Sequence, residues 1–200
     1  MPLIRDRIVN GLVALGAGVL IVALVAGLTH FIAILILPDL ASKDAYSVLS
    51  TRSVPNRMVL LPQPDVGDVA IPFRDPAAIS GVCFFDVTTT PVRIRLTTEE
   101  GRLLTLSFRT PEGKIFYSMT DRAALHDKID ILLVNDAQLK IVEDNDDEDA
   151  GLPTELRLKA PSTKGLIVAT ALIGRPGEAD AVKAHIETIT CAPEPLPPQG

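Results

Sequence analysis

The residues with the greatest catalytic potential in this sequence are two cysteines and three histidines: Cys83, Cys191, His30, His126 and His185. A cysteine beside a histidine can act as a nucleophile with its general base, so Cys83 with His126 or His185 would suit a thiol hydrolase. No spacing favours that pairing, and the histidines lack the short intervals at which zinc ligands recur. We therefore expect buried core residues here, with no metal site and no catalytic centre.

The two cysteines also have a non-catalytic interpretation. In an oxidising compartment, Cys83 and Cys191 would form one disulfide that closes most of the chain into a single loop. On the chain-entropy model, such a bridge stabilises a fold by roughly 4–5 kcal/mol. The alternative is a pair of buried free thiols, and the sequence leaves both open.

The most concentrated polar cluster lies in the segment FRTPEGKIFYSMTDRAA, which contains Arg109, Tyr117, Asp121 and Arg122. One interpretation is an Arg–Asp pair that fixes a hairpin to the helix cap after it. The other is a contact surface for an anion or a partner protein.

Nucleotide and phosphate motifs are incomplete in this sequence. Gly16-Ala17-Gly18 lacks a third glycine and lies in an apolar segment, and Ser162-Thr163-Lys164-Gly165 has no glycine-rich loop before it. No basic patch with interleaved aromatic residues indicates nucleic-acid binding. We therefore expect no cofactor and no nucleic-acid partner.

The element that must position everything else is an apolar segment over residues 8–37, which carries no Asp, Glu, Lys or Arg. About 20 apolar residues in a helix suffice to cross a bilayer. Arg5 and Arg7 precede the segment and only Lys43 follows closely, which favours a cytoplasmic N-terminus. A cleaved signal peptide has an apolar region of roughly 7–15 residues, so the longer segment here favours an uncleaved anchor.

This assignment gives the domain organisation. Residues 1–7 form a cytoplasmic stub, 8–37 a transmembrane helix and 38–52 a juxtamembrane helix and linker. Residues 53–192 form a periplasmic domain of a bacterial inner-membrane protein, and 193–200 form a Pro-rich disordered tail. The formal net charge of −6 arises mostly from the acidic run at 143–149, which reads as a solvated loop because it lacks the glycine and spacing of an EF-hand.

The domain after the span is predicted to be rich in β-strands. Alternating or continuous apolar patterns predict strands at residues 57–62, 92–97, 103–110, 114–119, 129–134, 155–160 and 165–173. Residues 92–110 read as a hairpin with its turn at 99–101. Asp75-Pro76 predicts the start of a helix that buries Ile79, Val82 and Cys83. A second helix is expected at 178–189.

These elements predict one N-terminal transmembrane helix followed by a β-rich α+β domain, built as an antiparallel sheet or a sandwich with helices at its edges. Sequential strands joined by short turns argue against a parallel α/β fold.

A family resemblance rests on the segments 73–76, 116–122 and 165–171 behind a single N-terminal span. Over residues 8–192 the chain resembles small alphaproteobacterial membrane proteins related to the uncharacterised DUF1254 group. In larger relatives that group accompanies a second domain, DUF1214, so the resemblance implies a companion protein and no known reaction. Phe84-Phe85 stands where such proteins often carry Arg-Tyr, so no role of that arginine transfers to this chain.

The sequence therefore predicts a protein that is anchored in the lipid bilayer and is more consistent with a non-enzymatic envelope subunit than with an enzyme. Its domain is expected to bind a companion membrane or periplasmic protein. The alternative is a lipid-binding or small-ligand-binding domain, because β-rich domains can enclose an apolar pocket.

Overall fold

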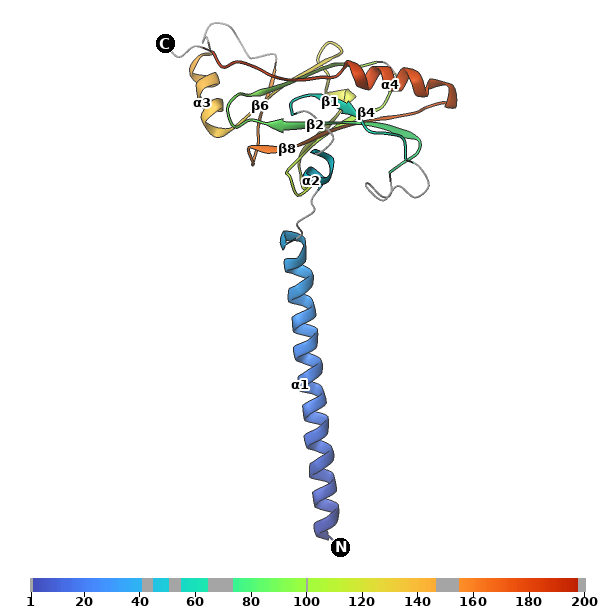
Figure 1. Ribbon diagram of the computed structural model, residues 1–200, viewed down its shortest axis with the longest axis vertical. Coiled ribbons are helices and arrows are strands. Elements are labelled where there is room, and N and C mark those ends of the chain that lie inside the picture. The colour runs from blue at the N-terminus through green and yellow to red at the C-terminus, as the bar shows by residue number, and fades with distance from the viewer. Residues whose placement is uncertain are drawn as a thin grey trace. The chain divides into compact units, whose positions relative to one another are not determined.

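The computed structural model describes residues 2–40, 45–50, 55–64, 74–99, 101–146 and 155–197. It divides into two units, Met1–Ser42 and Lys43–Gly200, and each unit is described here by itself (Figure 1). The predicted linker at 38–52 falls partly outside the described residues. So do the end of the acidic run and the last three residues of the tail.

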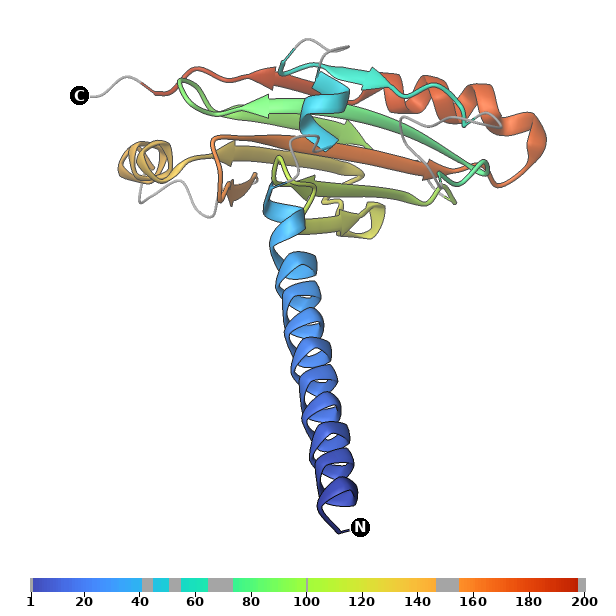
Figure 2. The same cartoon turned by 60° about the horizontal axis from the view of Figure 1, so that its bottom comes forward.

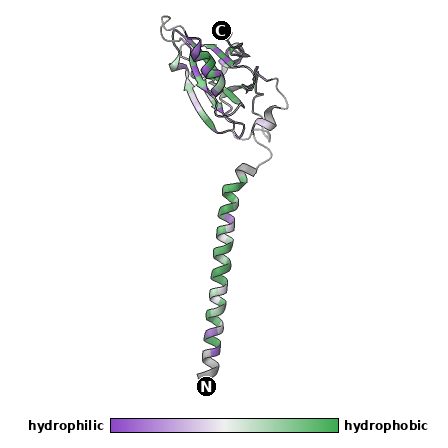
Figure 3. Cartoon of the chain, turned by 90° about the vertical axis from the view of Figure 1, so that its left-hand side faces the viewer, coloured by the Kyte–Doolittle hydropathy of each residue, from purple (hydrophilic) through white to green (hydrophobic). Residues whose placement is uncertain are grey.

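The first unit is the helix α1 (Pro2–Leu40). Its stretch Arg7–Leu37 is long and apolar enough to cross a membrane, and none of its side chains is buried against other protein. Figure 3 shows hydrophobic residues along most of the length of this stretch. A helix satisfies all of its backbone hydrogen bonds internally, which is what a bilayer requires.

The second unit is a β-sandwich with helices at its edges (Figures 1 and 2). Its larger sheet, sheet A, contains in spatial order β1 (Met58–Leu60), β2 (Ala78–Asp86), β8 (Lys164–Leu172), β4 (Leu104–Arg109) and β5 (Ile115–Thr120). Sheet B contains β7 (Leu156–Lys159), β6 (Lys128–Val134), β3 (Val92–Thr97) and β9 (Thr190–Pro193). Neighbouring strands are antiparallel except for β6 and β7, which are parallel.

The core lies between the two sheets. Alternate residues of each strand point inward, so that Ile94 and Ile131 of sheet B face Leu106 and Phe108 of sheet A in one apolar cluster. A disulfide between Cys83 of β2 and Cys191 of β9 joins the sheets, with the two Cα atoms 6.6 Å apart.

Three helices cover parts of the sandwich. The helix α4 (Ala179–Thr188) packs on β1, β2 and β8, and α3 (Asp136–Asp144) packs on the outer face of sheet B; the two lie at opposite ends of the domain (Figures 1 and 2). The short helix α2 (Ala45–Ser50) contacts sheet A through Tyr46, whose ring lies 5.5 Å from that of Phe84. Two 3₁₀ turns, η1 (Asp121–Ala123) and η2 (Pro176–Glu178), precede β6 and α4.

Paired capping bonds fix the start of α3. The side chain of Asn135 accepts a hydrogen bond from the Gln138 backbone N–H, and the Gln138 side chain accepts one from the Asn135 backbone N–H. Both side-chain amides also donate to the carbonyl oxygen of Val87, at 2.9 Å each. This capping box therefore attaches α3 to the loop after β2.

The predicted fold class is confirmed: a long apolar N-terminal helix is followed by a β-rich domain of two sheets with edge helices. Each of the seven predicted strands has a counterpart within a few residues of its predicted bounds, and the predicted terminal helix corresponds to α4. Val182, His185 and Ile186 of α4 are buried, whereas Ala181 is exposed.

The helix predicted after Asp75-Pro76 is wrong, because residues 78–86 form the strand β2. Asp75 instead accepts a hydrogen bond from the Ala77 N–H and closes a turn. Strand β2 lies inside sheet A and is buried on both faces, so its residues lack the alternation that marks a half-buried strand.

The hairpin predicted over residues 92–110 is also wrong. Strand β3 belongs to sheet B and β4 to sheet A, so the turn between them crosses from one sheet to the other. Alternation identified both strands, but alternation carries no information about which strand is the partner.

The tail expected to be disordered from residue 193 is instead attached to sheet B as far as Pro197. Residues 190–193 form β9, Glu194 pairs with Arg93, and Leu196 packs beside the cluster around Leu132.

Candidate functional site

Exposed leucines gather at one end of the sandwich, which we call the leucine end and define by Leu103, Leu125 and Leu172. Leu104 pairs with Ala171, and the N–H of Leu172 donates to the carbonyl of Leu103, so these two residues are neighbours. Leu125 lies in the turn before β6, whose first residue pairs with Thr97 at the end of β3. The exposed fractions are 45%, 58% and 41% respectively, so each leucine presents its side chain to the surroundings.

The turn that carries Leu125 is tightly constrained. Leu125 and Lys128 exchange both backbone hydrogen bonds, at 2.9 and 3.1 Å, around His126 and Asp127. Both central residues have positive φ, 52° and 59°. This left-handed conformation costs a non-glycine residue about 1–2 kcal/mol. Positive φ at both central residues is the type I′ geometry of a two-residue hairpin turn, which fixes the backbone at Leu125.

The structure separates the four residues of the predicted contact surface. Arg109 pairs with Ile115 at one end of the β4–β5 hairpin, where its side chain donates to Ser107 and to the Gly113 carbonyl. Asp121 follows Thr120, which pairs with Thr105 at the other end. Four residues of extended strand span about 13 Å, so Arg109 does not reach Asp121.

Tyr117 is also separated from Asp121 and Arg122. The Tyr117 ring packs 5.9 Å from the ring of Phe108 and belongs to the edge of the core. Asp121 and Arg122, in η1, lie at the leucine end, and Arg122 is exposed. One carboxylate oxygen of Asp121 is buried and has no hydrogen-bond partner in the described part of the chain. Closeness in sequence had suggested one cluster, but the hairpin places its members at opposite ends.

The disulfide rules out a Cys83 nucleophile, because both cysteines of the chain are consumed in it. The expectation of a buried His126 is wrong, because this residue is exposed in its turn, whereas His185 is buried on α4 with Nδ1 3.1 Å from a carboxylate oxygen of Glu99. Among the described residues, no group of three or more His, Cys, Asp or Glu side chains converges as a metal site would require.

The outer face of sheet B carries a second cluster, the arginine network, centred on Arg93. Its guanidinium contacts Asp130 at 2.8 Å, Glu155 at 2.5 Å and Glu194 at 3.2 Å. The hydrogen bond with Asp130 is the main cause that raises the pKa of Arg93. Since every arm of Arg93 is engaged by a carboxylate, the network joins β3, β6, the start of β7 and the chain after β9, and its role is structural.

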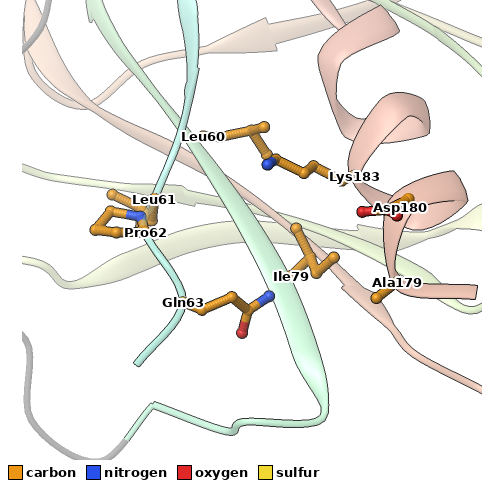
Figure 4. A pocket seen from close by; sticks show the side chains of 8 residues that line it. All are labelled: Leu60, Leu61, Pro62, Gln63, Ile79, Ala179, Asp180 and Lys183. Atoms are coloured by element: carbon orange, nitrogen blue, oxygen red, sulfur yellow. The ribbon is translucent and has the colours of Figure 1, made fainter. Parts of the chain in front are cut away.

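A hollow of about 380 Å³ lies between α4 and the chain that continues β1 (Figure 4). We call it the α4–β1 hollow; Leu60, Leu61, Pro62 and Ile79 form its apolar lining, and Gln63, Ala179, Asp180 and Lys183 complete it. Its size falls in the range of small-molecule sites. Sequence reasoning missed it, because its two walls are more than a hundred residues apart in the chain.

No family model matches the chain, and no curated protein matches it. Among solved structures, the VPA0106 protein from Vibrio parahaemolyticus is 12% identical with a TM-score of 0.53, and the match covers 78% of this chain and 38% of that chain. An uncharacterised protein from Burkholderia cenocepacia is 8% identical with a TM-score of 0.42, covering 78% of this chain and 42% of that one.

The chain thus spans less than half the length of both solved structures. At 12% identity, the likeness to the Vibrio protein concerns the fold alone. The resemblance to the DUF1254 group stays a prediction.

Proposed function

We propose that this protein is a non-enzymatic subunit, anchored by α1 in a bacterial inner membrane, whose domain binds a companion protein through the leucine end. The observation that carries the proposal is the grouping of three exposed leucines around a constrained turn. Exposed apolar side chains that group together and are rimmed by polar residues mark a protein interaction surface. Asp121 and Arg122 would then belong to the polar rim of the contact.

The periplasmic location has two supports. Basic residues are in excess before the span, which favours an N-terminus in the cytoplasm and a domain outside it. A structural disulfide persists in oxidising compartments such as the bacterial periplasm and is rare in the cytosol.

The companion is expected to be of the DUF1214 type, on the resemblance stated above. The match to the Vibrio protein covers only 38% of that chain, so that chain continues beyond the part that is similar. A domain that works next to other domains needs a surface by which it contacts them.

The test is purification of the full-length protein from its native membrane in mild detergent, followed by native mass spectrometry. A stoichiometric companion should accompany the wild type and should be reduced at least tenfold by the double variant L125D/L172D. The matched control is L156D, which alters a partly exposed leucine on β7, away from the leucine end. A lone chain in the wild type, or equal companion in all three proteins, would contradict the proposal.

A second candidate function, binding of a lipid or another small ligand, is favoured by the α4–β1 hollow. It predicts extra mass of ligand size on the purified chain.

A further inference from the structure

The α4–β1 hollow combines an apolar floor with exposed polar and charged groups at its mouth. Ile79, on β2, is almost fully buried at its base, and Leu60 and Leu61 are half-buried at its wall. Asp180 and Lys183 of α4 and Gln63 opposite them are exposed at the mouth. Figure 4 shows Lys183 extending from the helix toward Leu60, and Asp180 pointing to the space over Ile79.

The charges at the mouth are free to bind a ligand. In the part of the chain that the structure describes, neither Asp180 nor Lys183 forms an ion pair or a side-chain hydrogen bond. They are three residues apart on α4, so they project from the same side of the helix. Most other charged side chains that line hollows here are engaged, as Arg93, Glu155 and Arg157 show.

The opposite charges of Asp180 and Lys183 determine which charged groups a ligand in the hollow can carry. A simple anion would be attracted by Lys183 but repelled by Asp180. A simple cation would be attracted by Asp180 but repelled by Lys183. A head group with both an ammonium and an acidic group satisfies both side chains, and Gln63 can add a hydrogen bond. An apolar tail on the same molecule would cover Leu60 and Ile79.

We infer that the α4–β1 hollow binds a zwitterionic amphiphile, whose acidic group contacts Lys183, whose ammonium contacts Asp180 and whose apolar part packs on Leu60 and Ile79. This inference rests on the second candidate function and gives it a site and a ligand class. Two sources offer this chemistry: the phosphoethanolamine head group of a membrane lipid, and a free apolar amino acid.

The test is isothermal titration calorimetry on the full-length protein in a non-ionic detergent. The probes are dihexanoyl phosphatidylethanolamine, leucine, and dihexanoyl phosphatidylglycerol, which has the acidic group but no ammonium. Binding of the first identifies a lipid source, and binding of leucine alone identifies a free amino acid. Phosphatidylglycerol should bind at least about tenfold more weakly, because its head group offers hydroxyls but no cationic partner for Asp180.

The variants K183E and D180N should each weaken binding of the active probe about tenfold or more. K140E is the matched control, since Lys140 is an exposed residue of another helix, and it should bind as the wild type does. Equal binding of phosphatidylglycerol, or unchanged binding in K183E, would overturn the site but would leave the ligand-binding function standing. Absence of binding by every probe would overturn both.

Discussion

Gly165 is the residue at which the core has no space for a side chain. It pairs with Phe85 across β2 and β8, and the Phe85 ring lies over it. A Cβ at this position would lie 2.5 Å from Cζ of Phe85 and closer still to the carbonyl oxygen of Arg109. The glycine is therefore required by close packing.

The variant G165A should lose about 2–3 kcal/mol of unfolding free energy, because the ring or the neighbouring strand must shift. The measurement is a urea titration followed by tyrosine fluorescence, since both tyrosines of the chain, Tyr46 and Tyr117, lie in the domain. G177A is the control, because nothing lies within 4 Å of a Cβ there. Equal effects of the two substitutions would refute the packing argument.

Arg93 and Arg95 form a matched pair on the outer face of β3. The side chain of Arg93 is 18% exposed and holds three carboxylates, whereas that of Arg95 is 53% exposed and contacts two of the same carboxylates at longer distances. R93M should lose about 2–3 kcal/mol, because three carboxylates would be left together. R95M should lose less than about 1 kcal/mol, as exposed pairs usually do.

The pH dependence separates these variants further. Burial raises the pKa of Asp130, but hydrogen bonds and charge from Arg93 and Arg95 lower it by more, so the net pKa lies below its usual value. A lowered folded-state pKa stabilises the domain above the unfolded value of about 3.9, and this contribution is lost as the pH falls through the folded value. Urea midpoints should therefore fall as the pH drops below the unfolded value of about 3.9, and they should fall less in R93M. Parallel pH profiles of the two proteins would argue against this role of Arg93.

Single residues were predicted unevenly. The alternation of Val92, Arg93 and Ile94 correctly placed the arginine on the outside of a strand. Its partners were beyond reach of the sequence, because Glu155 and Glu194 come from distant segments that only the tertiary fold brings together. The predicted grouping of Arg109 with Asp121 was wrong for the opposite reason, since a hairpin separates these residues although they are close in sequence.

At the scale of elements, the disulfide is the side-chain cross-link that joins the two sheets. It joins β2 to β9 across 108 residues, and a loop of that length corresponds to about 4–5 kcal/mol on the chain-entropy model. The double variant C83A/C191A should lose free energy of that order in the urea titration. Dithiothreitol should lower the wild-type midpoint to that of the variant and leave the variant unchanged; a reductant effect on both proteins would point to another cause.

Elements with one buried face were the predictable ones. Strands β3, β4 and β7 alternate apolar and polar residues and were found from that pattern alone. Strand β2 was mistaken for a helix because both of its faces are buried, so its sequence does not alternate. Its outer face is covered by residues such as Tyr46, which packs on Phe84. Strand β9 was not predicted, because its four residues carry almost no periodic signal.

At the scale of the whole molecule, hydropathy was the most informative property. A charge-free apolar stretch and a domain of short alternating strands differ so strongly that composition alone separated the two units. The surfaces with a proposed function were not predicted, because the leucine end and the α4–β1 hollow are each assembled from at least three separate segments. A local sequence pattern does not show which loops lie side by side in the folded domain.

The link between Cys83 and Cys191 also orders events during biosynthesis. The ribosome adds about 5–20 residues per second, so Cys83 waits roughly 5–20 s for its partner to be made. During that interval β2 and most of the sandwich exist while Cys83 is an unpaired thiol and the strand β9 is missing from sheet B. The newborn chain is thus briefly open to oxidants and to other thiols, and the loop is closed covalently only after Cys191 has been added.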